Sequence, residues 1–177
     1  MKELRNALSC LRIEYTEVGD YNGAIAAAQQ IIEMKKQTGV ISRSTANRDL
    51  GDTLLRAGRR EEGLAALRRA ASILDENLLK GRSYTFDKEP SPYFRNELAS
   101  RLLSIAAAFT AARPEEQSAV ILKRLQPVLE AMVRDNPGNN PYRDTLLRTY
   151  RAAALAFRGL EDLAQSLDFE QKALKLE

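Results

Sequence analysis

The sequence contains no His and no Trp, and Cys10 is its only Cys. Without His, and with a single thiol, a zinc site built from His and Cys is excluded. The Ser–His and Cys–His nucleophile systems are excluded as well, because their general base is missing. One Cys cannot form an intrachain disulfide, so nothing indicates a disulfide-stapled secreted domain. Catalysis by carboxylates, Lys or Tyr passes this test and would need positive support of its own.

Long apolar runs are also missing. No stretch approaches the roughly 20 residues that span a bilayer, and Lys2, Glu3 and Arg5 interrupt the place where a signal peptide has its apolar core. We therefore predict a cytoplasmic protein that does not enter the membrane. The 27 Lys plus Arg stand against 24 Asp plus Glu, a net charge of +3 over 177 residues. Because this excess is slight and forms no long basic run, we do not expect nucleic-acid binding.

The sequence is rich in the apolar spacing of amphipathic helices. Apolar residues recur every three or four positions, and Ala and Leu far outnumber Val and Ile, which favours helix. We predict helices at about 4–18, 25–39, 45–57, 60–79, 94–112, 114–133, 142–158 and 162–176. Gly39 would end the second helix and Ser44 or Thr45 would cap the third. Cys10 would be a half-buried apolar filler.

Residues 81–92 interrupt this pattern. They contain two Pro and two aromatic residues without a helical period (GRSYTFDKEPSP), which predicts a surface loop inserted between helices. The aromatic residues in and around the loop are Tyr84, Phe86, Tyr93 and Phe94. They would either pin the loop onto the helices or offer an aromatic contact to a partner.

The eight predicted helices form four pairs, which suggests a repeat. Leu8, Leu11, Tyr15, Gly19-Asp20 and Ala24 in the first pair, and Leu50-Gly51, Gly58 and Ala70 in the second, resemble the tetratricopeptide repeat (TPR) family. The later pairs offer Leu102, Ile105-Ala106 and Phe109, and then Tyr150, Ala153-Ala154, Phe157, Glu161-Asp162 and Ala173. The resemblance implies an all-α fold of antiparallel helix hairpins, stacked as a right-handed TPR-like solenoid of about eight helices. The alternative is a helical bundle without repeats.

The sequence departs from the TPR pattern at several positions. Arg12 stands where the family has a small residue, Gly63 and Ser166 replace an Ala, and Pro114 occupies a turn. Matching positions lie about 39, 55 and 48 residues apart rather than 34. The repeats would cover 3–40, 43–80, 93–136 and 140–177 of one domain, 1–177, with the insertion at 81–92. Such long-period repeats resemble those attached to bacterial signalling proteins such as serine/threonine kinases, so we expect a piece of a longer protein.

The TPR resemblance also implies where a partner would bind. The first helices of the pairs would line a concave groove for an extended peptide or a partner helix. By position, the candidate groove residues are Asn6, Ser9, Ile13, Arg48, Asp52, Arg56, Arg148, Arg151 and Leu155. The arginines favour an acidic ligand, since Arg binds carboxylates through two hydrogen bonds, although solubilising the surface is the simpler role.

These observations predict a non-catalytic scaffold that binds a protein or peptide, with no cofactor and no metal. The sequence contains no Gly-rich phosphate loop, and its acidic pairs are adjacent, so on a helix they diverge rather than share a site. The alternative is a self-associating module that forms homo-oligomers through Leu4, Leu8 and Leu11 at one end and Leu163, Leu167 and Leu174 at the other. A third hypothesis, a helical enzyme using carboxylates, requires two acidic side chains converging in a closed pocket.

Overall fold

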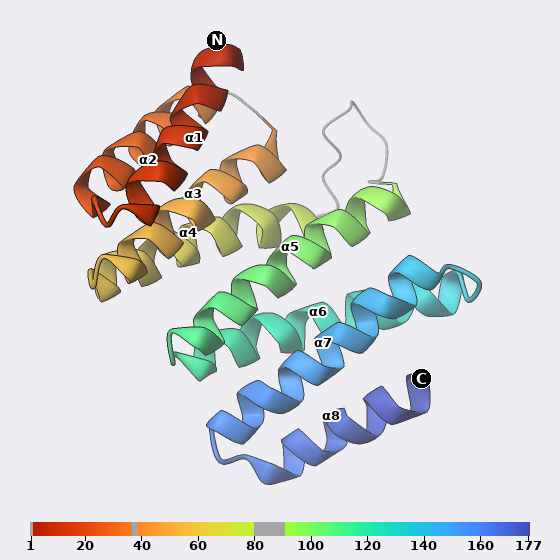
Figure 1. The fold of residues 1–177 in the computed structure, drawn as a ribbon. Helices are drawn as coiled ribbons and strands as arrows, with labels where there is room; N and C mark the ends of the chain where they lie inside the picture. Colours follow the sequence, from red (N-terminus) through yellow and green to blue (C-terminus); the bar gives the residue numbers. More distant parts are fainter. Residues whose placement is uncertain (1, 37–38, 80–90) are drawn as a thin grey trace. The chain divides into compact units, whose positions relative to one another are not determined.

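The computed structural model describes residues 2–36, 39–79 and 91–177, which divide into two compact units, Met1–Asn77 and Leu78–Glu177. These residues contain eight helices and no strand, which confirms the predicted all-α fold (Figure 1). The helices are α1 (Lys2–Glu17), α2 (Tyr21–Lys35), α3 (Val40–Arg56), α4 (Arg60–Leu79), α5 (Pro92–Ala111), α6 (Glu115–Asp135), α7 (Asn140–Gly159) and α8 (Leu163–Leu176).

The two helices of each pair are joined by a turn of one design. Every turn is three residues long. Its middle residue has a positive φ: 81° at Gly19, 75° at Gly58, 65° at Arg113 and 60° at Glu161. This left-handed residue reverses the chain and lets a following backbone N–H reach back into the helix, as Asp162 N–H does to the Phe157 carbonyl at 2.9 Å. The shared turn produces the sequential hairpins that the TPR resemblance predicts, even where Arg113 and Glu161 replace Gly.

Small residues lie where the helices of a pair cross. The equivalent positions in the second helices hold Ala24, Gly63, Ser118 and Ser166, all of them buried. At Gly51, an added Cβ would lie 2.9 Å from Leu67 and 3.1 Å from the Gly63 carbonyl oxygen, so only Gly permits this close approach. Ser166 bonds across its crossing, where its Oγ donates to the Ala154 carbonyl at 3.0 Å. These small residues, which the TPR resemblance places at fixed positions in each pair, are therefore contact positions between helices.

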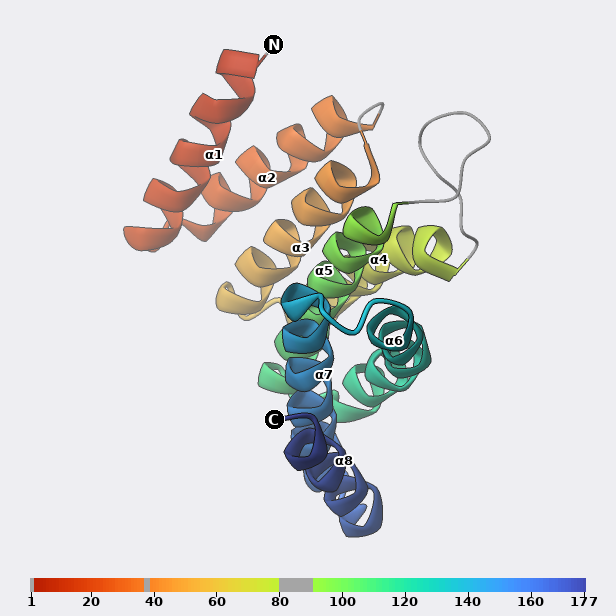
Figure 2. The same cartoon turned by 90° about the vertical axis from the view of Figure 1, so that its right-hand side faces the viewer.

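The N-terminal unit, Met1–Asn77, is built around α2, which packs against both α1 and α3 (Figure 2). Its buried contacts follow the predicted apolar spacing. One cluster joins Leu8, Ala27, Ile31 and Ala46, and another joins Ile25, Ala28, Leu50, Leu54 and Ala66. These aliphatic side chains leave the opposite face of α1 in solvent.

In the C-terminal unit, Leu78–Glu177, α5, α6 and α7 contact one another and α8 packs on α7. The rings of Phe157 and Phe169 stack with their centroids 5.6 Å apart, joining α7 to α8. Tyr150 is buried beside them and donates to Glu130 Oε1 at 2.7 Å. Burial of its ring, together with this hydrogen bond, raises the pKa of Tyr150 well above its usual value.

Three local predictions were wrong. Gly39 does not end α2; it directly precedes α3, with φ −58° and ψ 157°. Ser44 does not cap α3, because burial of Val40 carries the helix further back and leaves Ser44 inside it, where its hydroxyl donates to the Ala70 carbonyl at 2.9 Å. Cys10 is exposed rather than half-buried, since it lies on the face of α1 turned away from α2.

Some predictions concern residues or arrangements outside the described parts of the two units. Residues 81–90 of the loop predicted over 81–92, with Tyr84 and Phe86, fall outside the described residues. The last two residues of that range belong to the start of α5, since Ser91 caps this helix and Pro92 begins it. At the edge of the described residues, the Tyr93 side chain is 78% exposed and Phe94 is half-buried. The single domain over 1–177 and the right-handed stacking concern the whole chain and stay predictions. Among the described helices, none has the length and apolarity that a membrane crossing requires.

Candidate functional site

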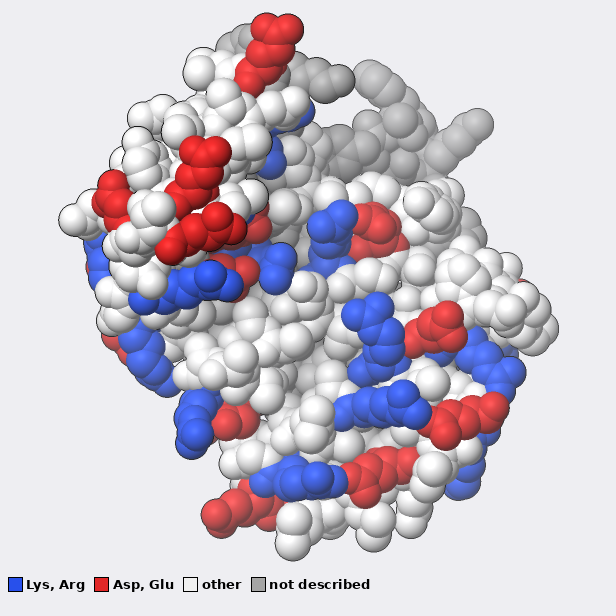
Figure 3. Space-filling model, in the orientation of Figure 1, with Lys and Arg blue, Asp and Glu red and all other residues white. Residues whose placement is uncertain are grey.

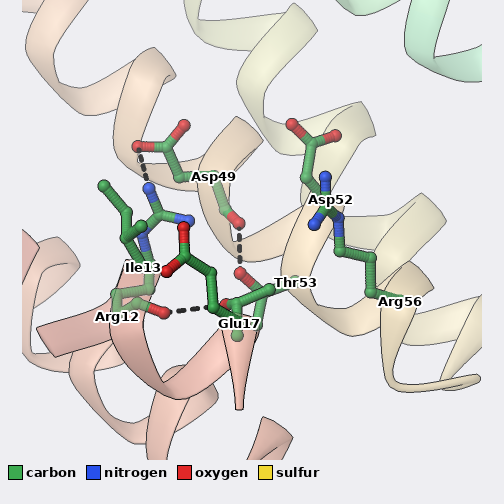
Figure 4. A pocket seen from close by; sticks show the side chains of 8 residues that line it. Arg12, Ile13, Glu17, Asp49, Asp52, Thr53 and Arg56 are labelled. Carbon is green, nitrogen blue, oxygen red and sulfur yellow. Dashed lines mark hydrogen bonds and ion pairs between the residues drawn. The ribbon is translucent and has the colours of Figure 1, made fainter. Parts of the chain in front are cut away.

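An open cleft lies between α1 and α3, the first helices of the two hairpins in the N-terminal unit (Figure 4). Its volume is about 310 Å³. The lining side chains come from one face of each helix: Arg12, Ile13, Thr16 and Glu17 from α1, and Asp49, Asp52, Thr53 and Arg56 from α3. First helices are where the TPR resemblance places a groove, and three of the predicted groove residues, Ile13, Asp52 and Arg56, meet here.

Arg12 spans the cleft. Its Nη2 lies 3.7 Å from Asp49 Oδ2, and the two side chains are 18% and 31% exposed (Figure 4). The Arg12 Nε is buried and has no hydrogen-bond partner among the described residues. Arg12 is the long residue at a position where the other first helices carry Gly51, Ala106 and Ala154. The Arg12 side chain occupies the space between α1 and α3 and links the two helices by an ion pair. The first helices of the C-terminal unit, α5 and α7, have Ala at this position and contact each other directly.

The acidic side of the cleft lies on α3. Arg48 Nη2 lies 3.3 Å from Asp52 Oδ2, one turn apart on the same helix. Burial raises the pKa of the Asp52 carboxyl above its usual value, against the opposing effect of Arg48. Asp49 also contributes to this rise, because two neighbouring carboxylates disfavour each other's charged forms. Asp52 is therefore held less firmly in its charged form than an exposed Asp.

The remaining lining groups offer polar and apolar contacts. Thr53 Oγ1 donates to the Asp49 carbonyl at 2.8 Å, and Thr16 Oγ1 donates to the Arg12 carbonyl at 2.7 Å. Each hydroxyl therefore donates its hydrogen bond within its own helix, and its oxygen lone pairs can accept a hydrogen bond from a ligand. Ile13 is 47% exposed and supplies an apolar contact at the cleft. The cleft can accept and donate hydrogen bonds, pair with either charge, and cover a small apolar group.

The other predicted groove residues of the N-terminal unit do not line this cleft. Asn6 is exposed on α1, outside the residues that line it. Ser9 is half-buried and donates to the Arg5 carbonyl at 3.0 Å, one turn back. Arg48 does not line the cleft, but it forms an ion pair with Asp52, which does.

In the C-terminal unit, most arginines of α7 are engaged with α8. Arg151 pairs with Glu177, Arg158 pairs with Glu170, and Arg143 donates to the Leu176 carbonyl. Basic and acidic side chains accordingly alternate over α7 and α8 (Figure 3). Arg148 and Leu155, the other two predicted residues, are exposed on α7. Arg151, one of the predicted groove residues, is therefore engaged in holding the C-terminal end of the chain against α7.

Sequence reasoning missed five residues of the cleft: Arg12, Thr16, Glu17, Asp49 and Thr53. The signal for Arg12 was present, since it was the one first-helix residue that broke the small-residue pattern. The other four had no signal, because polar residues on a helix face look the same whether they line a cleft or a flat surface. In the described part of the chain, no group of three or more acidic or Cys side chains is arranged to hold a metal ion.

Comparison with known proteins adds little to this geometry. No protein-family model matches the sequence, and no curated protein matches it. Among solved structures, the MamA protein matches at 15% identity and a TM-score of 0.36, covering 100% of this chain and 93% of that one. A candidate kinesin light chain of Podosopora anserina with nearly identical TPR-like repeats matches at 14% identity and a TM-score of 0.37, covering 99% and 96%. Similarities at this level do not decide a function, which we infer from the cleft alone.

Proposed function

We propose that the chain is a non-catalytic binding module that holds a segment of a partner polypeptide in the cleft between α1 and α3. The observation that carries this proposal is the cleft itself, about 310 Å³ in volume, open, and lined by both charges around an exposed Ile13. A polypeptide segment brings backbone donors and acceptors together with side chains of either charge, and the cleft has a partner for each of these groups.

The charges at the cleft narrow the expected ligand. Arg12 forms an ion pair with Asp49, and Arg48 forms one with Asp52. An acidic ligand would therefore have to compete with these carboxylates for the two arginines. Arg56 and Glu17 are exposed at the cleft. We expect an acidic side chain of the ligand to pair with Arg56 and a basic one with Glu17. The acidic ligand predicted from the sequence becomes, in this proposal, a segment of mixed charge.

The geometry favours binding over catalysis. Glu17 and Arg56 are in contact with solvent, and the Asp49 carboxylate is paired with Arg12. General acid–base groups gain most where water is kept out, and an open cleft does not provide this condition. A binding site for a short segment tolerates an open rim, because water-filled edges are common at interfaces.

A peptide array read with the purified chain tests the proposal. Peptides of mixed charge should bind the unaltered chain, and Arg56→Ala should weaken those that contain Asp or Glu by about threefold to tenfold. Ile13→Ala should weaken all bound peptides. Lys175→Ala, which removes an exposed charge from α8, is the matched control and should change nothing. If Arg56→Ala and Ile13→Ala both bound the same peptides as the unaltered chain, the cleft would not be the binding site.

The alternative, self-association through the terminal helices, has its own supporting observation. Leu163, Leu167 and Leu174 of α8 are 69%, 55% and 70% exposed, and Leu4 of α1 is 57% exposed. Apolar faces of this kind on terminal helices are typical contact surfaces of repeat proteins. Sedimentation velocity at micromolar concentration decides this alternative, since a strict monomer would contradict it.

A further inference from the structure

The outer face of α1 carries an apolar row that its own unit leaves uncovered. Four residues of α1, Leu4, Ala7, Leu11 and Glu14, and the first residue of the following turn, Val18, follow one another at intervals of three and four residues, and all five are exposed. We call these five residues the α1 seam. Leu4, Leu11 and Val18 are 57%, 39% and 78% exposed. Alternating steps of three and four are the spacing with which one helix packs along another in a coiled coil.

The α1 seam is not a remnant of the core, because the core of the unit uses a different face of the same helix. Leu8 is buried against α2 and α3, and Tyr15 is half-buried. In heptad terms these two occupy the position next to the seam on one flank, so that flank is closed by the protein itself. The opposite flank holds Glu3, Cys10 and Glu17, which are exposed. A helix lying on the seam would therefore meet charged residues on one side only.

The charge along this face is negative. Glu3, Glu14 and Glu17 are exposed, and Figure 3 shows acidic side chains gathered over α1 among uncharged ones. Both arginines of α1 are turned away from the seam. Arg12 pairs with Asp49 across the cleft. Burial lowers the pKa of Lys35 in α2, and the charge of the nearby Arg5 adds to this effect, so Arg5 lies on the side of α1 that faces α2. The acidic face stands out on a chain whose net charge is +3.

We propose that the α1 seam is the docking surface for a basic amphipathic helix of another protein. The partner helix would place apolar residues between Leu4, Leu11 and Val18, and would set Lys or Arg opposite Glu3, Glu14 and Glu17. Charges that flank an apolar seam select the partner and its orientation. The α1 seam lies on another face of α1 than the cleft between α1 and α3, and the two proposed surfaces share only Glu17, which flanks the seam.

A second copy of this chain is a poorer occupant. Pairing α1 with α1 of another copy would bring Glu3, Glu14 and Glu17 near the same residues, and like charges across a helix interface oppose association. Docking α8 of a second copy on the α1 seam is also unfavourable, because the exposed Leu residues of α8 are not flanked by an excess of basic residues. On α8, Asp168 pairs with Lys172 and Glu170 pairs with Arg158 of α7, so these charges are already balanced and offer no basic surplus to the α1 seam.

Two designed peptides test this proposal by fluorescence anisotropy. Each has about three heptads with Leu along its seam, and the flanking positions are Lys in one peptide and Glu in the other. The Lys peptide should bind the chain, increasingly weakly as salt rises, and the Glu peptide should not. Glu3→Lys with Glu14→Lys should weaken the Lys peptide by about tenfold. Both positions lie outside the cleft, so these changes leave the proposed peptide site intact.

Controls separate a lost surface from a lost fold. Glu76→Lys reverses the charge of another exposed residue in the same unit. The chain with this change should bind the Lys peptide as tightly as the unaltered chain does. Leu11→Ser should also weaken binding, and far-UV circular dichroism should show unchanged helix in every variant. Equal binding of both peptides, or unchanged binding after Glu3→Lys with Glu14→Lys, would overturn the proposal. So would a dimer of the unaltered chain that Leu11→Ser dissociates, since the seam would then join two copies.

Discussion

Replacing Gly51 by Ala tests whether the crossing of α3 and α4 is as close as the structure shows. The new Cβ would lie 2.9 Å from Leu67 Cγ and Cδ2 and 3.1 Å from the Gly63 carbonyl oxygen. Neither neighbour can yield easily, because Leu67 is fully buried and the carbonyl belongs to the backbone. Overpacking a core costs about 1–3 kcal/mol, while removing Gly from a helix interior returns about 1 kcal/mol. We expect a net loss of up to about 2 kcal/mol in the free energy of unfolding.

Urea unfolding followed by far-UV circular dichroism measures this loss, and hydrogen exchange locates it. Exchange should quicken in α3 and α4, the two helices that cross at Gly51. Gly138→Ala is the matched control, since a Cβ there meets nothing within 4 Å, and its effect should stay within about 0.5 kcal/mol. Gly63→Ala should cost about as much as Gly51→Ala, because its Cβ would lie 2.8 Å from Leu55 Cγ and 3.0 Å from the Gly51 carbonyl oxygen. A Gly51→Ala chain at least as stable as the original would refute the close crossing.

Two further substitutions follow from the backbone and the charges. Burial raises the pKa of Asp52, so the folded chain keeps this proton at a pH where the unfolded chain, with a pKa of about 3.9, has lost it. The free energy of unfolding therefore falls as pH rises above about 4. Asp52→Asn removes this titration, so in urea unfolding its free energy of unfolding relative to the original chain should be higher above that pH than below it. Glu161 has a φ of 60°, a conformation that costs a side-chain-bearing residue about 1–2 kcal/mol. Glu161→Gly should stabilise the chain by about 0.5–1 kcal/mol in thermal melts, after the loss of backbone entropy of Gly is subtracted; a lower midpoint would contradict the strained turn.

The turns show how far local patterns reach. Gly19 and Gly58 predicted their turns, because Gly adopts a positive φ at little cost. Arg113 and Glu161 adopt the same conformation without any such signal, and only the alignment with the earlier pairs made Glu161 a turn residue. Ser44 shows the opposite error. Its hydroxyl looked like a helix cap, but the burial of Val40 lengthened α3 and turned Ser44 toward Ala70.

The sequence by itself determined the eight helices, their pairing and the small residues at their crossings, because the apolar period and the turn chemistry act over a few neighbouring residues. It also marked Arg12 as an exception. Only the tertiary structure decided what that exception does. The cleft exists because α1 and α3 stand far enough apart for Arg12 to reach Asp49 between them. That separation is set by packing between residues distant in the chain, which a local pattern does not record.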